Sequence, residues 1–351
     1  MTYVAAKTTI PLPRVHAYSL NSDNLINSPY LVMDYIEGKP LHDLGFQRGH
    51  RTPASVVKKV HQQISNIYLQ LRQLEFPAIG ALGLAQSASE PLNTCSPDKM
   101  VVSGRPITMD MALQERAGYR PGRVIKPGTT FHSAGEFVNA LVALSVNQLD
   151  KTRDAGSNQQ QARELLYTRY AFYGFAFEEL APCNGPFVLI HGDLLLHDNN
   201  ILFDHDFNLV AVIDWEWSFV APLEFLVPPV WLIGSGISMV LACSEWFNAE
   251  VQALQHQIGK LEQARRQLSL LRSSWVSTAT ARGAVTIAAL LHPEKIEEVF
   301  WGSLFWHIQG INQLDPDFDV SEYLEKNMTH LIDDYKVSEK LQKVITRQVC
   351  L

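Results

Sequence analysis

Cysteine is scarce in this 351-residue chain, which has only four cysteines, and they lie far apart with no CxxC pair. This scarcity excludes a disulfide framework and argues against a zinc site, because both need cysteines in number or at short spacing. The chain does not open with a basic segment followed by a long apolar run, so no signal peptide is expected. Together these absences predict an intracellular, cytoplasmic protein.

An excess of positive charge is also missing, since 29 Lys and Arg face 36 Asp and Glu, a formal net charge of −7. Proteins that bind nucleic acid are usually basic, so this balance argues against such a partner. A charge-free run from Phe225 to Cys243 is about long enough to span a bilayer, but Pro228-Pro229 and Gly234 would break such a helix. We therefore expect no membrane span, and instead a buried loop followed by a core helix.

Regular alternation of strands and helices is absent as well. Two short strands at the N-terminus, Val15–Tyr18 and Tyr30–Ile36, are expected to form an antiparallel pair. The other expected elements are helices over Ser55–Leu74, Ala134–Leu149 and Ala162–Leu180, an irregular segment with a small hairpin over Gly80–Phe131, strands over Phe187–Ile190, Ile201–Phe203 and Leu209–Ile213, and an almost entirely helical chain after Asp214. This order predicts an α+β fold rather than an alternating one.

Five polar residues follow or open short apolar runs between positions 187 and 217, namely His191, Asp193, Asn200, Asp214 and Glu216. Phosphoryl transfer needs one acid to orient the attacking hydroxyl and a second acid to hold Mg²⁺ against the nucleotide phosphates. A further hard oxygen, often an amide, completes the metal shell. Asp193 suits the first role, Asp214 the second and Asn200 the third. The alternative is that Asp193 and Asp214 are ordinary turn residues that cap strand ends.

These motifs together resemble the catalytic loop and metal-binding motif of the aminoglycoside phosphotransferase and choline kinase group, the small-molecule branch of the protein-kinase-like fold. The resemblance runs from about Thr8 to about Leu232. It implies a reduced N-terminal β lobe and a large, mainly helical C-lobe. It also implies that Mg-ATP phosphorylates a hydroxyl of a small molecule, with Asp193 as the catalytic base and with a metal site formed by Asn200, Asp214 and Glu216.

The segment Tyr30-Leu-Val-Met-Asp-Tyr-Ile-Glu-Gly38 resembles the hinge strand of the same group, whose backbone contacts adenine. By this resemblance the base is lined by Met33, Asp34, Tyr35 and Ile36. Three tryptophans near the motifs could form an aromatic cage for a cationic substrate. We expect them to pack in the core instead; they are Trp215, Trp217 and Trp231.

The catalytic loop departs from the kinase pattern, which places an asparagine five residues after the aspartate, where this chain has Asp198. Either the loop is longer by two residues and Asn200 faces the metal, or Asp198 takes that place. Because Asn200-Ile-Leu matches the following strand of the group, Asn200 is favoured, with His197 and Asp198 looped out. His191 is expected to bond backbone beside Asp193 rather than to carry protons.

Three parts of the group's nucleotide site are missing before the hinge: a glycine-rich loop, a strand lysine and a helix glutamate. The first glycine is Gly38, the only earlier lysine is Lys7, and no glutamate precedes Glu37. Either the chain is a truncated product or its nucleotide lobe is degenerate, and in both cases weak kinase activity is expected. The alternative function is a non-catalytic kinase-like binding or scaffold protein. Residues 1–40 are expected to be the remnant of the N-lobe and hinge, and residues 41–351 the helical C-lobe.

Overall fold

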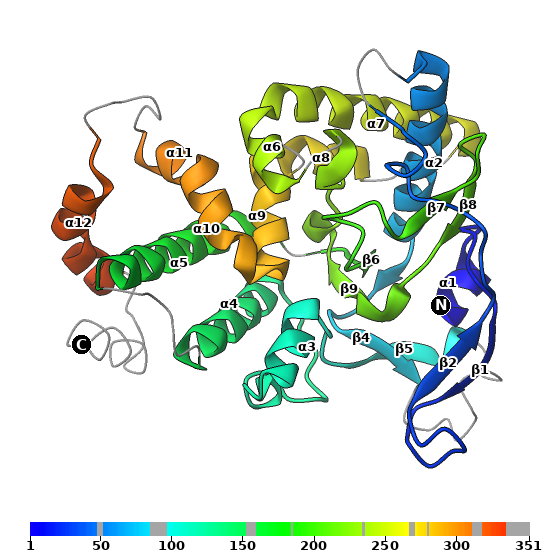
Figure 1. The fold of residues 1–351 in the computed structure, drawn as a ribbon, viewed down its shortest axis with the longest axis horizontal. Helices are drawn as coiled ribbons and strands as arrows, with labels where there is room; N and C mark the ends of the chain where they lie inside the picture. Colours follow the sequence, from blue (N-terminus) through cyan, green and yellow to red (C-terminus); the bar gives the residue numbers. More distant parts are fainter. Residues whose placement is uncertain are drawn as a thin grey trace.

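The computed structural model describes residues 1–47, 52–84, 97–151, 159–183, 185–233, 236–266, 271–278, 281–310 and 318–334. The strands and the N-terminus lie toward one end of the elongated molecule, and the helices α4, α5 and α12 lie toward the other (Figure 1). The expected α+β arrangement is confirmed. The expected absence of a membrane span agrees with a narrower finding: no described helix is both long and apolar enough to cross a bilayer.

The strands form four small antiparallel groups. These are the hairpin of β1 (Val15–Ser19) and β2 (Tyr30–Met33), the sheet of β3 (Glu75–Phe76), β6 (Phe187–His191) and β9 (Ser218–Pro222), the hairpin of β4 (Ala81–Leu84) and β5 (Met100–Gly104), and the hairpin of β7 (Ile201–Phe203) and β8 (Leu209–Val212).

β6 is the central strand of the three-stranded sheet, and all five of its residues are buried. Continuous apolar sequence is typical of a strand that is covered on both faces. The register runs from Phe187 opposite Pro222 to His191 opposite Ser218. The end of β6 therefore delivers His191, and the loop that follows it, to the edge where β9 begins.

The helices are α1 (Thr2–Lys7), α2 (Ala54–Arg72), α3 (Met109–Arg116), α4 (Ala134–Lys151), α5 (Gln159–Leu180), α6 (Ile237–Ala242), α7 (Ser244–Arg265), α8 (Leu271–Thr278), α9 (Ala281–Leu291), α10 (Ile296–Val299), α11 (Phe305–Gln309) and α12 (Val320–Asp334), with a π-helical turn at Phe300–Leu304 and short 3₁₀ segments at Pro97–Lys99, Pro121–Arg123, Trp215–Trp217, Leu223–Phe225, Val230–Ile233 and Pro293–Lys295.

The helix α2 packs against β6, the strand that leads into the site region. Its apolar residues recur at three- and four-residue spacing, and Val60, Ile64, Ile67 and Leu71 are all buried. This face packs on β6 and on α7. The helix expected over Ser55–Leu74 is thus confirmed to within two residues at each end.

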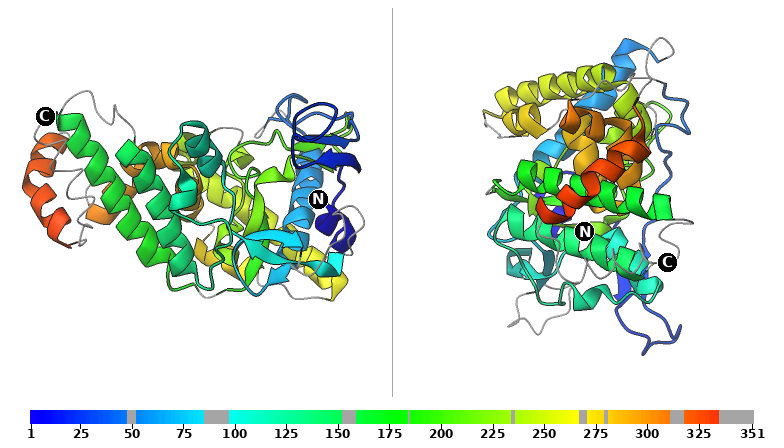
Figure 2. Two further views of the ribbon diagram at one scale, coloured as in Figure 1. Left: turned by 90° about the horizontal axis from the view of Figure 1, so that it is seen from below. Right: turned by 90° about the vertical axis from the view of Figure 1, so that its left-hand side faces the viewer.

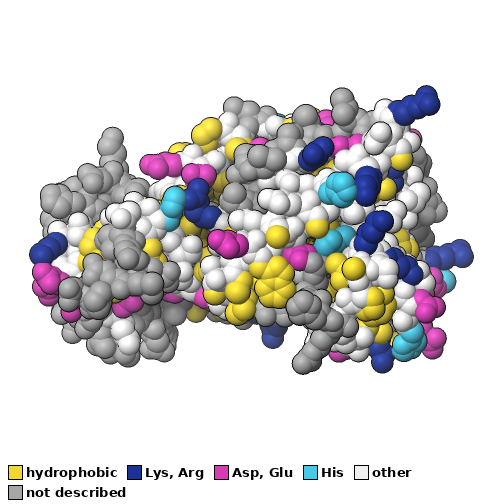
Figure 3. Space-filling model, turned by 90° about the horizontal axis from the view of Figure 1, so that it is seen from above, with side chains coloured by type: hydrophobic (Ala, Val, Ile, Leu, Met, Phe, Trp, Pro, Cys, Tyr) yellow, Lys and Arg dark blue, Asp and Glu magenta, His cyan; other side chains and the backbone are white. Residues whose placement is uncertain are grey.

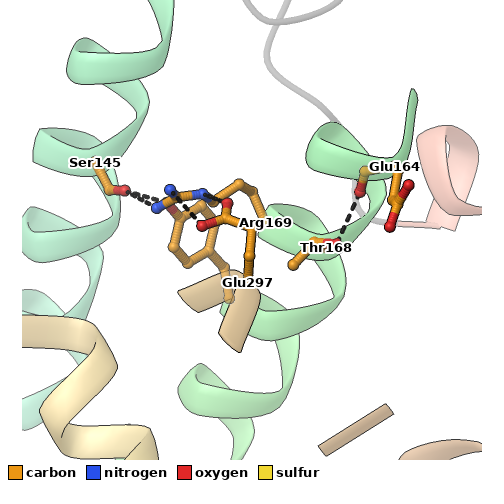
Figure 4. Close-up of polar contacts among 6 residues, drawn as sticks. Ser145, Glu164, Thr168, Arg169 and Glu297 are labelled. Carbon is orange, nitrogen blue, oxygen red and sulfur yellow. Dashed lines mark hydrogen bonds and ion pairs between the residues drawn. The ribbon is translucent and has the colours of Figure 1, made fainter. Parts of the chain in front are cut away.

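The helices α4 and α5 lie side by side, and α12 packs on α5 at the end of the molecule farthest from the N-terminus (Figure 2). One charged side chain, Arg169 of α5, is buried where α4, α5 and α10 meet. It is paired with Glu297 of α10 at 2.8 Å from Nε to Oε1 and 3.2 Å from Nη2 to Oε2, and Nη1 donates to Ser145 of α4 at 3.1 Å (Figure 4). This ion pair ties three helices together.

Three expectations about the elements need amending. The chain after Asp214, expected to be almost entirely helical, also contains the strand β9, which pairs with the side of β6 opposite β3. The strand expected to reach Ile36 ends at Met33; directly after it, the Asp34 N–H donates to the Arg14 carbonyl at 3.0 Å and the Asp34 carboxylate accepts the Arg14 N–H at 3.1 Å. The segment Gly80–Phe131 contains the expected hairpin, but also the unexpected helix α3 (Met109–Arg116).

Candidate active site

His191 joins the end of β6 to the end of β8. Its Nε2–H donates to the carbonyl of Ile213 at 2.8 Å, and its Nδ1 accepts the backbone N–H of Asp193 at 3.3 Å. The indole of Trp215 packs edge-on against the imidazole, with 4.7 Å between ring centroids. Burial lowers the pKa of His191 to about 4, so the ring is neutral near pH 7. The contacts are those of a structural histidine, as expected from the sequence.

This burial predicts acid sensitivity of the fold. The neutral ring is favoured in the folded chain, so its stabilising effect is present above the ordinary histidine pKa of 6.5 and is lost as the pH falls toward 4. At pH 4.5 we expect the His191 contribution to be smaller than at pH 7.5 by roughly 2 to 3 kcal/mol. Urea unfolding of the wild-type chain and of His191→Gln at both pH values measures this difference. Equal losses of stability in the two proteins would contradict the assignment.

Asn200 lies beside Asp193. Its Nδ2 donates to Asp193 Oδ2 at 2.8 Å and, more weakly, to the Asp193 carbonyl at 3.3 Å. The side chain is buried, and its backbone carbonyl accepts the N–H of Ile213 at 2.9 Å. One amide thus orients the carboxylate of Asp193 and links the loop to the β7–β8 hairpin.

Asp198 turns away from this carboxylate. Its Oδ1 accepts from His42 Nδ1 at 2.7 Å, and its Oδ2 accepts the His42 backbone N–H at 3.1 Å. Of the two residues that could follow Asp193 in the kinase pattern, the structure brings Asn200 to it and binds Asp198 to the segment after β2. The loop lengthened by two residues is accommodated at His197 and Asp198.

Asp214 and Glu216 lie on a tight turn after β8. Asp214 has left-handed backbone geometry, with φ 65° and ψ 45°, and it precedes the 3₁₀ turn Trp215–Trp217. The close approach of this turn to the loop leaves no room for a side chain at Gly192, whose added Cβ would lie 2.4 Å from the Trp217 carbonyl oxygen. The glycine between His191 and Asp193 is therefore a steric requirement.

Negative charge accumulates where these segments meet. The pKa of Glu216 is raised, first by partial burial and then by the charges of Asp214 and Asp193. Carboxylate and amide oxygens are the ligands that Mg²⁺ prefers, and Mg²⁺ commonly keeps several waters beside one or two carboxylates. The donor set of Asn200, Asp214 and Glu216 fits that ion. Within the described ranges no cluster of three or more His, Cys, Asp and Glu forms a ready-made metal cage.

The predicted adenine segment lies at the exposed end of the β1–β2 hairpin. Asp34 accepts from His16 Nε2 at 2.6 Å, while Tyr35 is 91% exposed and Met33 and Ile36 are also partly open to solvent. Just beyond, Lys39 and Phe203 exchange two backbone hydrogen bonds of 2.9 and 2.8 Å, which hold this segment against β7. The segment is thereby held next to β7, the first strand of the β7–β8 hairpin, which directly follows Asn200.

Reasoning from the sequence missed His292, which lies between α9 and α10. It is buried, burial lowers its pKa, and the charges of Glu294 and Asp193 act on it in the opposite direction. No catalytic motif surrounds His292 in the sequence, because the helices before and after it show only the spacing of buried apolar residues. Of the three tryptophans expected to pack in the core, Trp215 lies in it, Trp231 is half-buried against it, and Trp217 is half-buried outside the core cluster.

A family model described as the phosphotransferase enzyme family (APH) matches residues 1–225. This range contains every one of the site residues predicted from the sequence.

Curated relatives match shorter stretches. The chain is 28% identical over 108 residues to "Altered inheritance of mitochondria protein 9, mitochondrial" of Zygosaccharomyces rouxii, which is 30% of this chain and 17% of that protein. It is 30% identical over 82 residues to a "Subtelomeric hrmA-associated cluster protein" of Aspergillus fumigatus, which is 23% of this chain and 15% of that protein. The match thus spans less than a fifth of either relative.

Among solved structures, a candidate aminoglycoside phosphotransferase of Ralstonia eutropha aligns with 97% of this chain and 80% of its own, at 11% identity and a TM-score of 0.41. A thermostable mutant of aminoglycoside phosphotransferase APH(4)-Ia aligns with 95% of this chain and 81% of its own, at 14% identity and a TM-score of 0.33.

Proposed function

The chain belongs to the phosphotransferase enzyme family, and from this premise we propose that it transfers the γ-phosphoryl group of Mg-ATP to a hydroxyl of a small molecule. Asp193 is the proposed base. Asn200 and Asp214 are the proposed metal ligands, and Glu216 supports them. The observation that carries the proposal is the 2.8 Å hydrogen bond from Asn200 Nδ2 to Asp193 Oδ2. It orients the Asp193 carboxylate close enough to Glu216 for the charges of Asp193 and Asp214 to raise the pKa of Glu216.

The contacts suggest how these residues would act. The amide of Asn200 occupies Asp193 Oδ2, which leaves Oδ1 to accept the proton of the acceptor hydroxyl. The acceptor oxygen then forms a bond to the γ-phosphorus as the bond from that phosphorus to the ADP oxygen breaks, and the proton passes to Asp193. Mg²⁺, when bound, would neutralise charge on the phosphates. His191, kept neutral by burial, holds the backbone of the loop rather than the proton.

We assign different proposed roles to the N-terminal part and to the rest of the chain. Residues 1–40 would contact the nucleotide base through Met33, Asp34, Tyr35 and Ile36, and residues 41–351 would carry the catalytic loop, the metal site and the acceptor. On the face that Figure 3 shows, Lys and Arg side chains lie mostly toward the end that carries the N-terminal elements, together with several Asp and Glu side chains. The positive charges would favour an anionic nucleotide at that end.

One observation favours a second function, that of a non-catalytic kinase-like binding protein. Lys7 of α1 pairs with Asp98 at 2.6 Å, so its ammonium group is already engaged by a carboxylate. Phosphate positioning of the family kind is therefore not provided by this lysine. Loss of such positioning lowers transfer rates strongly but leaves binding possible.

The Mg²⁺ dependence of nucleotide binding tests whether Asp214 is a metal ligand or acts only through its negative charge. We expect Mg-ATP at a hundred times its Kd to stabilise the full chain by about 2.7 kcal/mol, and ATP without Mg²⁺ to stabilise it less. Asp214→Asn should remove most of the Mg²⁺-dependent part. Thermal unfolding with each ligand measures the shift, and Asp206→Asn, an exposed residue of the neighbouring β7–β8 turn, is the control. Unchanged Mg²⁺ dependence in Asp214→Asn would refute its role as a ligand.

A further inference from the structure

A cavity of about 260 Å³ lies beside the catalytic loop, between the loop residues Leu196–Asp198, the segment after β2, the N-terminal half of α2 and the 3₁₀ turn Val230–Ile233. Pockets for small molecules typically measure roughly 300–1,000 Å³, so this one suits a compact ligand. Most of its wall is apolar and comes from Leu41, Phe46, Ile64, Leu196, Trp231 and Leu232.

The two residues that lengthen the catalytic loop form part of this wall. His197 and Asp198 both line the cavity, and Asp198 is bound there by His42, another lining residue. The loop between them and Asp193 is held in place from the cavity side: Trp231 donates to the Leu194 carbonyl at 2.8 Å, and Val230 N–H donates to the Leu195 carbonyl at 2.9 Å. The departure from kinase spacing thus builds a pocket wall only a few residues from the proposed base.

The acidic groups at the cavity are turned toward protein partners. Both oxygens of Asp198 accept from His42, as described above. Behind the wall, Glu250 Oε2 lies 3.1 Å from Nε2 of the lining residue His61, and Glu250 Oε1 accepts from Trp246 at 3.3 Å. A charged ligand would lose its hydration in an apolar pocket without gaining an unengaged counter-charge, which is costly. The wall therefore favours a neutral ligand with an apolar body.

We propose that this cavity binds the apolar, ring-sized body of a neutral alcohol, and that this alcohol is the acceptor in phosphoryl transfer. The acceptor role rests on the proposed function, whereas binding in the cavity does not. In the transfer, the hydroxyl oxygen bonds to the γ-phosphorus, the bond to the ADP oxygen breaks, and the hydroxyl proton goes to Asp193. His42, His197 and Asp198 supply polar groups of the wall, but both oxygens of Asp198 are already engaged by His42.

The test uses three probes with one body and different head groups: 2-phenylethanol, 2-phenylethylamine and phenylacetate. Each is titrated into the full chain at pH 7.5 without nucleotide, followed by ligand-observed NMR. We expect 2-phenylethanol to bind at least tenfold more tightly than the ammonium or the carboxylate. Failure of 2-phenylethanol to bind, or tighter binding of either ion, would overturn the proposal.

Two glycine variants locate the binding. Gly236 lines the cavity, and a Cβ added there would meet nothing within 4 Å, so Gly236→Phe introduces a bulky side chain at the cavity wall without a clash at its Cβ. Gly128 has equally open surroundings and does not line the cavity, so Gly128→Phe is the matched control. We expect Gly236→Phe to weaken 2-phenylethanol at least tenfold and Gly128→Phe to change it less than twofold. Equal effects of the two variants would place the probe elsewhere and refute the assignment.

The same proteins distinguish this inference from the proposed function. Production of ADP from Mg-ATP, measured with and without 2-phenylethanol, reports transfer, while the NMR titration reports the cavity alone. If the probe binds as expected and no ADP forms, the proposed function fails and the cavity assignment stands. If ADP forms in response to alcohols that bind equally well to Gly236→Phe, the cavity assignment fails and the proposed function stands.

Discussion

Asp193→Asn is expected to lower the rate of phosphoryl transfer from Mg-ATP to an alcohol by about 10²- to 10⁴-fold, the usual contribution of a general base. The substitution keeps the size of the side chain and an oxygen that can accept from Asn200, so the loop geometry is preserved. Binding of Mg-ATP should change little, because the proposed metal ligands are other residues. A time course of ADP release with and without the alcohol measures the rate, and thermal shift with Mg-ATP measures binding.

The control for this experiment is Asp206→Asn, which removes a carboxylate from the nearby β7–β8 turn without touching the loop. We expect it to retain the wild-type rate within about twofold. Asp206 is exposed, and dissolved salt screens the electrostatic effect of its charge on the catalytic loop. Transfer by Asp193→Asn at the wild-type rate would show that Asp193 is not the base. Binding of Mg-ATP by the wild-type chain with no transfer to any alcohol would establish the non-catalytic alternative.

Glu297→Gln is expected to destabilise the fold by about 1 to 3 kcal/mol, because it takes the negative charge away from the buried Arg169 guanidinium, although Glu297 itself is 37% exposed. The Arg169 side chain is only 8% exposed, and its Nη1 also donates to Ser145, a neutral hydroxyl. Tyr173 also donates to that hydroxyl, so Ser145 cannot turn to compensate. Urea unfolding monitored by circular dichroism measures the loss.

A paired replacement tests the cause. Because apolar side chains of similar volume can substitute for a buried ion pair, Arg169→Met with Glu297→Met should recover a large part of the stability lost in Glu297→Gln. The exposed pair of Lys326 and Glu322, 69% and 65% open to solvent, supplies the control, and Glu322→Gln should cost less than about 1 kcal/mol. Equal effects of Glu297→Gln and Glu322→Gln would contradict the argument from burial.

Much of the candidate site could be predicted because its residues lie close together in the sequence. His191, Asp193, Asn200, Asp214 and Glu216 fall within one strand–loop–hairpin unit, and short-range geometry alone brings them near one another. Periodicity located α2 for the same reason, since its buried face follows from local spacing. The structure adds the direction of each bond, such as the amide of Asn200 facing Asp193.

What could not be predicted depends on contacts between distant segments. The bond of Asp198 to His42 joins residues 156 positions apart, and no local pattern indicates it. The strand β9 exists because β6 has a free side, which is a property of the sheet rather than of the sequence Ser218–Pro222. His292 reaches the site through the packing of α9, and helical spacing reveals only that it is on a buried face.

The two backbone hydrogen bonds between Lys39 and Phe203 also constrain the distance between the two parts of the proposed nucleotide site. This pairing joins the segment proposed to hold adenine to β7, the strand that follows Asn200, and Gly38 allows the close approach, because an added Cβ there would lie 2.9 Å from the Cβ of Leu202. This backbone pair therefore constrains the separation between the proposed adenine segment and the proposed metal site. We therefore expect a ligand whose ring and phosphates are spaced differently from those of ATP to reach either the proposed adenine segment or the proposed metal site, but not both.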